Sequence, residues 1–175
     1  MFQTTTLRER RSMHTNVQVA REFALRAHGS QQYGEHPYVY HLDAVAALLE
    51  PFGERAQVAA YLHDTVEDTA TTIEEIEASF GQAMAETVAI LTDEEGEMRS
   101  VRKAKTNAKL AATTNTLALT VKAADRLANL QEGQRDAAGK LEMYRREHTA
   151  FRKAAYRDGL CEDLWQRIDA IIAGE

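Results

Sequence analysis

The sequence predicts an all-α protein folded as a single domain. The chain has 175 residues, a length that fits one domain with a substantial core. It contains only two prolines and nine glycines, so few residues interrupt helices. Apolar residues recur at helical spacing, and no segment shows the clear alternation of a strand. We therefore expect a bundle of about eight or nine helices over residues 15–175, preceded by a flexible segment over residues 1–14.

Local signals set the expected helix boundaries. Asn16 is a suitable N-cap for the first helix, and Gly29 closes it. Pro37 and two glycines break helicity in an aromatic loop over residues 28–40. Further caps and breaks give helices that span about residues 16–27, 42–49, 54–67, 72–80, 82–91, 99–111, 116–131, 140–157 and 160–173.

Composition excludes several functional classes. The net charge of −6 argues against general nucleic-acid binding, and no apolar run is long enough to span a membrane. The N-terminus lacks the apolar core of a secretory signal. The only cysteine, Cys161, cannot form an internal disulfide, so we expect a reduced, cytoplasmic setting.

The distribution of charge is more informative than its total. Residues 56–98 contain eleven acidic residues and no Lys or Arg, whereas residues 98–124 contain six basic residues and no Asp or Glu. This order is consistent with a metal held beside an anionic ligand. It is equally consistent with two oppositely charged, solvated surfaces.

The stretch Tyr61–Thr69, YLHDTVEDT, carries the chemistry that the sequence predicts. In a continuous helix, residues four apart lie one above the other, so His63 aligns with Glu67 and Asp64 aligns with Asp68. The other edge of this helix is apolar. Such a polar cluster has no use in a core, but it suits a metal ion and a water nucleophile.

Two residues elsewhere in the chain would complete this site. His41 follows the aromatic loop, and Asp125 lies in the apolar stretch Ala123–Leu130, where a carboxylate needs a cation partner. Together with His63 and Asp64 they form a mixed nitrogen and oxygen set that suits Mn²⁺, Fe²⁺ or Zn²⁺ better than Ca²⁺.

The remaining polar residues divide into catalytic and substrate-binding candidates. Glu67 and Asp68 are the natural acid and base beside the ligands, although they could be surface acids at a helix end. Asn129 shares a helix face with Asp125 and would contact a sugar or phosphate, or be a satisfied interior amide. Phosphate contacts are expected from the basic helix, where Arg102, Lys105 and Lys109 share a face flanked by Arg99 and Lys103, or these residues form a solvated face. Lys122 is a further phosphate candidate or part of a structural ion pair. Tyr144 would close over the ligand or simply pack a helix.

The linked motifs resemble a known family. His41, His63-Asp64 and Asp125 resemble the HD superfamily of metal-dependent phosphohydrolases. The extended motifs over about residues 20–132 resemble the hydrolase domain of RelA/SpoT-type proteins, in particular stand-alone small alarmone hydrolases: HDTVEDT, Phe80-Gly81, LTDE and VKAADRLANL. The resemblance implies one Mn²⁺ held by these four residues and a water assisted by Glu67 and Asp68. It also implies removal of the 3′-pyrophosphate of (p)ppGpp to give GDP or GTP, with Asn129 at the nucleotide.

Two departures from the family concern the substrate. The loop GSQQYGEHPYVYH lacks the usual Arg-Lys pair, and Gln131-Glu132 replace a common Arg-Thr. Tyr33 or Tyr38 would then stack on the base instead. The alternatives are a phosphatase or pyrophosphohydrolase acting on another nucleotide, such as NADPH, and a non-catalytic nucleotide-binding module. A homo-oligomer is a reasonable expectation.

Overall fold

The chain folds as a bundle of helices, as the sequence predicts. The computed structural model describes residues 16–135 and 139–175, so the expected flexible segment over residues 1–14 lies outside the described residues. The helices are α2 (Asn16–His28), α3 (Val39–Leu48), α4 (Glu54–Leu62), α5 (Thr65–Asp68), α6 (Ile73–Phe80), α7 (Gln82–Leu91), α8 (Arg99–Ala112), α9 (Thr116–Arg135), α10 (Lys140–Ala155) and α11 (Glu162–Ala173). A 3-10 turn, η1 (Glu50–Phe52), follows α3.

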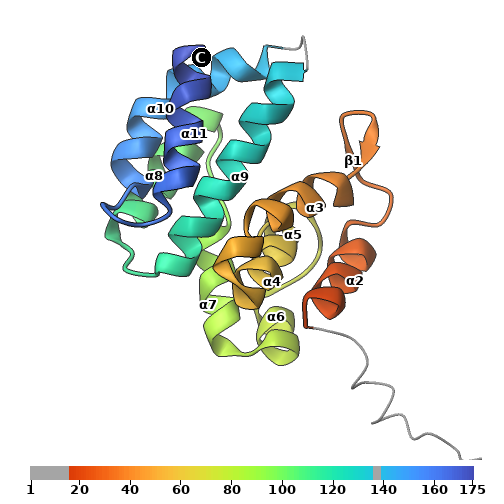
Figure 1. Ribbon diagram of the computed structural model, residues 1–175. Coiled ribbons are helices and arrows are strands. Elements are labelled where there is room, and N and C mark those ends of the chain that lie inside the picture. The colour runs from red at the N-terminus through yellow and green to blue at the C-terminus, as the bar shows by residue number, and fades with distance from the viewer. Residues whose placement is uncertain (1–15, 136–138) are drawn as a thin grey trace, which may run out of the picture.

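Helix α9 is the central element of the fold. It lies between the group formed by α8, α10 and α11 and the group formed by α2 to α7 (Figure 1), and it contacts α3, α4, α7, α10 and α11. It is buried on nearly all sides because small and aliphatic residues cover its surface. Leu119, Val121, Leu127 and Leu130 are at most 1% exposed. The polar residues that α9 does carry are therefore held in fixed positions.

The predicted boundary signals act largely as expected. Thr72 caps α6 through a reciprocal capping box with Glu75. Gly81 joins α6 to α7 with a φ of 86°, a conformation that glycine adopts without strain. Pro37 directs the chain into α3, which starts three residues before the expected position. These signals orient α3 so that His41 lies in its first turn.

Two local features differ from the sequence prediction. The predicted third helix is broken between α4 and α5, and His63 and Asp64 occupy the break. The predicted aromatic loop contains a small antiparallel hairpin, β1 (Gln32–Tyr33) and β2 (His36–Pro37). Strands of two residues are too short to show an alternating pattern, so sequence periodicity cannot reveal them.

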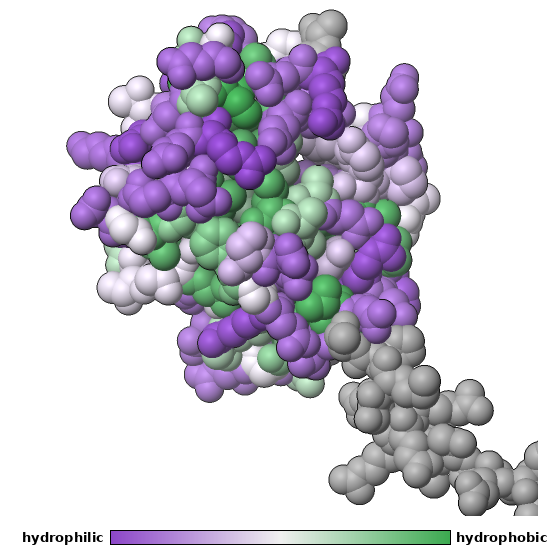
Figure 2. Space-filling model, in the orientation of Figure 1, coloured by the Kyte–Doolittle hydropathy of each residue, from purple (hydrophilic) through white to green (hydrophobic). Residues whose placement is uncertain are grey.

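The surface is largely polar. Hydrophilic residues cover most of the face shown in Figure 2, and hydrophobic residues surface between them in small groups. Within the described ranges, no helix combines the length and the apolar character needed to cross a membrane.

Candidate metal centre and active site

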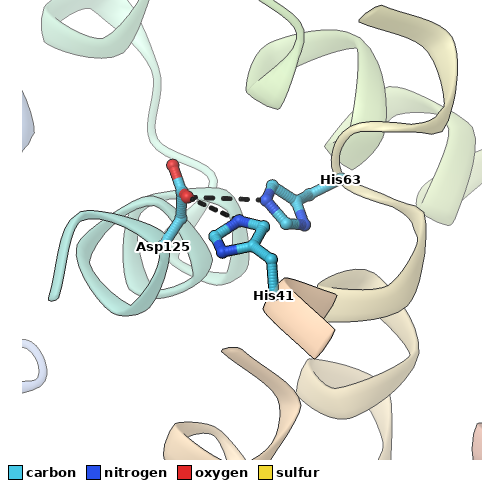
Figure 3. Close-up of side chains that lie close together, drawn as sticks. All are labelled: His41, His63 and Asp125. Carbon is cyan, nitrogen blue, oxygen red and sulfur yellow. Dashed lines mark ion pairs between the residues drawn. The ribbon is translucent and has the colours of Figure 1, made fainter. Parts of the chain in front are cut away.

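Three side chains from distant parts of the chain converge at the centre of the protein. His41 projects from α3, His63 from the end of α4, and Asp125 from the middle of α9 (Figure 3). Their ligand atoms all lie within 4.8 Å of one another. Asp125 Oδ1 is 3.2 Å from His41 Nε2 and 3.6 Å from His63 Nε2. The site is therefore built at the junction of α3, α4 and α9.

The break between α4 and α5 brings Asp64 into the same cluster. Asp64 Oδ2 lies 3.0 Å from His63 Nε2 and 3.6 Å from His41 Nε2. On a regular helix the side chains of neighbouring residues diverge by about 100°, so His63 and Asp64 would not both face one point. Asp64 instead has φ −101° and ψ −4°, which turns its side chain toward the histidines. Thr65 Oγ1 donates a hydrogen bond to the Leu62 carbonyl that the break leaves without a helical partner (2.7 Å).

The orientation of His63 shows that the cluster fits a cation. Its Nδ1 lies 2.6 Å from the Ala60 carbonyl, which only accepts, so Nδ1 carries a proton and Nε2 is the nitrogen that can bind an ion. His63 is fully buried, and Nε2 makes no hydrogen bond. A carbonyl partner on the other ring nitrogen is typical of metal-ligating histidines.

The electrostatics of the cluster lead to the same conclusion. Burial alone would lower the pKa of His63, but the adjacent Asp64 and Asp125 raise it well above its ordinary value. Burial alone would raise the pKa of Asp64, but His63 and His41 hold it well below its usual range. The two carboxylates thus create a strongly negative environment around the imidazoles. A divalent cation would satisfy it better than a single proton.

Asn129 supports the Asp125 carboxylate from the next turn of α9. Its Nδ2 donates to Asp125 Oδ1 (2.6 Å), and its Oδ1 accepts a hydrogen bond from the Tyr33 hydroxyl (2.9 Å). The Tyr33 ring in turn stacks on His41, with 4.7 Å between ring centroids. Asn129 lines the central pocket, but its amide is already bonded to protein groups. Tyr33 supports two members of the cluster and does not present an open face on that side for a base.

Tyr38 links the cluster to the predicted acid and base. Its hydroxyl lies 2.7 Å from Oδ2 of Asp64 and 2.7 Å from Oδ2 of Asp68. Its ring stacks on His28 at 4.3 Å, so it is not free to stack on a base on that side. A phenolic hydroxyl has one hydrogen and can donate to only one of the two carboxyls at a time. Tyr38 therefore couples the position of Asp68 to that of Asp64.

Glu67 lies at the mouth of the same pocket. Its Oε2 accepts a hydrogen bond from the Asp93 backbone N–H (2.8 Å). The residue retains exposed surface, but the protein surrounds its carboxylate closely enough that burial raises its pKa. A carboxyl with a raised pKa is better matched to proton transfer near neutral pH than an ordinary glutamate.

The central pocket has an acidic wall and a basic wall. It has a volume of about 160 Å³, and its acidic side is formed by Asp64, Glu67, Asp68 and Asp125. Its basic side is formed by Arg99, Lys103, Lys122 and Arg126. Lys122 is buried, donates to the Leu91 carbonyl (3.1 Å), and lies 3.8 Å from Asp93 and 3.9 Å from Asp125. The sequence left two roles open for Lys122, phosphate binding and ion pairing. Both remain open, because Lys122 forms ion pairs and also lines the pocket.

The structure does not bring the other expected phosphate contacts into this pocket. Arg102, Lys105 and Lys109 bond to backbone carbonyls of residues 89–96, and Lys109 also pairs with Glu94. They hold the segment between α7 and α8. The adjacent face of α8 supplies Arg99 and Lys103 instead, and Lys103 pairs with Asp93. Spacing alone shows that Arg99 and Lys103 share a face, but not which face of α8 meets the site.

Arg126 is the residue that the sequence analysis missed. It is only 7% exposed, and its guanidinium lies over the rings of Tyr144 (4.6 Å) and Phe151 (4.2 Å). Tyr144 also lines the pocket, and burial raises its pKa to about 12. The only sequence signal for Arg126 was its position next to Asp125. That signal was weak, because adjacent residues on a helix point in different directions. Here Asp125 faces α3 while Arg126 faces α10.

A larger cavity lies away from this centre. It has a volume of about 470 Å³ and lies between α4, α6 and α7, where Arg55, Val58, Phe80 and Met84 line it. It contains no member of the His41, His63 and Asp125 cluster. Chemistry and not size therefore identifies the central pocket as the candidate active site.

Known proteins resemble this chain in sequence and in fold. The model of the HD domain family matches residues 20–161. Guanosine-3′,5′-bis(diphosphate) 3′-pyrophosphohydrolase MESH1 of Danio rerio is 38% identical over 117 residues, which cover 63% of this chain and 64% of that protein. The Xenopus tropicalis protein of the same name is 37% identical over 123 residues, which cover 66% and 68%.

A solved structure gives the same result. It is described as that of a metazoan ortholog of SpoT that hydrolyzes ppGpp and plays a role in starvation responses. It aligns with a TM-score of 0.80 and 25% identity, covering 92% of this chain and 96% of that one. The resemblance that HDTVEDT and VKAADRLANL indicate is thus confirmed over most of the described chain. The chain belongs to the HD-domain family, with relatives of the RelA/SpoT and MESH1 type.

Proposed function

We propose that the protein is a metal-dependent hydrolase that removes the 3′-pyrophosphate of (p)ppGpp, giving GDP or GTP and pyrophosphate. The observation that carries this proposal is the convergence of His41, His63, Asp64 and Asp125 in one pocket with Glu67, Asp68 and the basic wall. The names of the relatives supply the nucleotide.

The four residues of the cluster would hold one divalent ion, for which we propose Mn²⁺. The two imidazoles and two carboxylates form a donor set of the kind that transition metals prefer, and the bare Nε2 of His63 supports this assignment. When bound, such an ion polarises a phosphoryl oxygen and lowers the pKa of water. Dialysis against a chelator, followed by addition of Mn²⁺, Fe²⁺, Zn²⁺ or Mg²⁺, would rank the metals by recovered turnover.

Glu67 and Asp68 would move the protons of the reaction. Hydrolysis joins a water oxygen to the phosphorus nearest the ribose and breaks the bond from that phosphorus to the 3′-oxygen, which takes up a proton. Glu67 is held by the Asp93 N–H at the pocket mouth, where it would orient or deprotonate the water. Asp68, fixed by the Tyr38 hydroxyl, would assist as the second member of the pair.

The basic wall would bind the pyrophosphate as it leaves. Lys103, Lys122 and Arg126 line the same pocket as the acids, and cations placed where negative charge develops stabilise the transition state of phosphoryl transfer. Arg102, Lys105 and Lys109, which were expected to bind phosphate, would act indirectly by fixing residues 89–96.

The proposed function is tested by incubating the purified protein with Mn²⁺ and ppGpp and measuring GDP and pyrophosphate. Turnover of NADPH or another nucleotide in place of ppGpp would reject the alarmone substrate and retain the chemistry. Asp64→Ala separates an enzyme from a non-catalytic binding module. Loss of metal and turnover together supports the enzyme, whereas nucleotide-dependent effects that persist without metal would reject it.

Two further expectations stay proposals. A reduced, cytoplasmic setting is supported by the single cysteine, Cys161, which is buried and free. Self-association into a homo-oligomer would be measured directly by light scattering coupled to size-exclusion chromatography.

A further inference from the structure

The central pocket is too small for the substrate that it would process. Its volume is about 160 Å³, whereas sites for small molecules and cofactors usually measure about 300–1,000 Å³. A nucleotide with its 3′-pyrophosphate at His41 and Asp125 must therefore extend into a neighbouring space.

A groove between α8 and α10 opens from the basic wall. This α8–α10 groove has a volume of about 420 Å³ and is lined by Arg99, Lys103, Asn107, Arg126, Arg146 and Phe151. Arg99, Lys103, Arg126 and Phe151 also line the central pocket, so the two spaces adjoin each other along these side chains. Together they provide the room that a nucleotide needs.

The charges that line the α8–α10 groove are incompletely neutralised. Glu147, its acidic residue, forms a bidentate ion pair with Arg99 (2.7 and 3.2 Å). The same carboxylate lies 3.7 Å from Arg126 Nη1, beyond hydrogen-bond reach, and this buried nitrogen makes no hydrogen bond.

Arg146 adds a second available guanidinium at the rim. It is exposed, and it makes no hydrogen bond or ion pair with any residue in the described parts of the chain. Guanidinium groups bind phosphate oxygens in a bidentate manner, and a buried donor without a partner is costly until an anion reaches it. The groove therefore has the features of an anion-binding site.

We propose that the α8–α10 groove is a second anion subsite, which binds the phosphate chain at the 5′ end of a nucleotide whose 3′-pyrophosphate occupies the central pocket. Arg126 stands between the two spaces, and Arg146 binds the distal phosphates. The inference rests on the proposed function and assigns the residues that bind the 5′ phosphates, so a nucleotide with phosphates at both the 3′ and 5′ positions binds more tightly than one with a 3′-pyrophosphate alone.

The test compares two substrates in steady-state kinetics with the metal-loaded enzyme. One is ppGpp, and the other is guanosine 3′-diphosphate with a free 5′-hydroxyl. Arg146→Gln should raise KM for ppGpp about tenfold. A hydrogen bond to a charged group contributes at least the free energy that corresponds to about a tenfold change in affinity. It should leave kcat unchanged, and it should leave both constants unchanged for the truncated substrate.

Arg145→Gln is the matched control. Arg145 precedes Arg146 on α10, but its Nη2 points to the Ile171 carbonyl of α11 (3.5 Å). This variant should match the wild type with both substrates. Equal effects of Arg146→Gln on both substrates, or no effect on either, would overturn the subsite.

A binding measurement separates this inference from the proposed function. If the wild type hydrolyses neither substrate, the proposed function fails, and calorimetry with inorganic pyrophosphate and chelator-treated protein still tests the groove. Weaker binding in Arg146→Gln than in Arg145→Gln supports the subsite. Equal binding in the two variants rejects it.

Discussion

Removing the hydroxyl of Tyr38 is the sharpest test of the active-site geometry. In Tyr38→Phe the ring keeps its stack on His28, so the local packing is preserved. The change removes the two 2.7 Å contacts to Asp64 and Asp68. A hydrogen bond to a charged group contributes about 1.5–3 kcal/mol, which corresponds to about a tenfold to hundredfold change in rate.

The expected result is a fall in kcat with little change in KM. Asp68 would lose its anchor, and turnover at saturating metal should drop by at least about tenfold. Loss of a hydrogen bond behind Asp64 should also weaken metal binding by about tenfold or more. Steady-state kinetics on ppGpp and a Mn²⁺ titration measure the two effects separately.

Tyr40→Phe is the matched control for this experiment. Tyr40 is exposed, and its hydroxyl makes one long contact to Arg135 Nη1 (3.5 Å), so its loss should change neither constant. A higher KM at unchanged kcat in Tyr38→Phe would show that Tyr38 binds the nucleotide, as the sequence analysis expected. Wild-type kinetics and metal affinity in Tyr38→Phe would refute the positioning role.

Three further outcomes are expected. Glu67→Gln should retain most of the metal, measured by elemental analysis, and lower turnover by more than about tenfold; metal loss would instead make Glu67 a ligand. Because burial raises the pKa of Glu67, the acidic limb of the wild-type pH–rate profile should lie above the ordinary glutamate range and disappear in Glu67→Gln. Burial would raise the pKa of Asp93, but Lys122 and Lys103 lower it. This contribution to the free energy of unfolding is present above the ordinary aspartate pKa and lost as pH falls through the lower folded value. Denaturant titrations from pH 6 to 3 should therefore show a weaker acid dependence in Asp93→Asn.

The fold and the convergence of His41, His63 and Asp125 were predictable because both leave local signals. Helical periodicity and caps such as Thr72 determine where helices form, and each predicted helix has an observed counterpart. The third corresponds to α4 and α5 together. Asp125 was recognisable because a carboxylate in an apolar stretch requires a cation. These arguments need only the residue and its neighbours in the sequence.

The basic wall was not predictable in the same way. Arg102 and Arg99 lie on the same helix, and only the packing of α8 against α10 determines which of them faces the site. The direction of Arg126 likewise depends on which helix covers that side of α9. The break at Asp64 was hidden because HDTVEDT contains no proline or glycine. Tertiary contacts among α3, α4 and α9 oppose the helical preference of that stretch.

The contact between the hairpin and α9 has a consequence for how such a chain diversifies. Tyr33 holds the Asn129 amide, which holds the Asp125 carboxylate, so the loop that departs most from the family is bonded to the residues proposed to hold the ion. Recognition and reactivity are therefore not separate modules. A hairpin redesigned for another nucleotide would also shift the affinity for the ion, so selection for new substrates should be run across a range of metal concentrations.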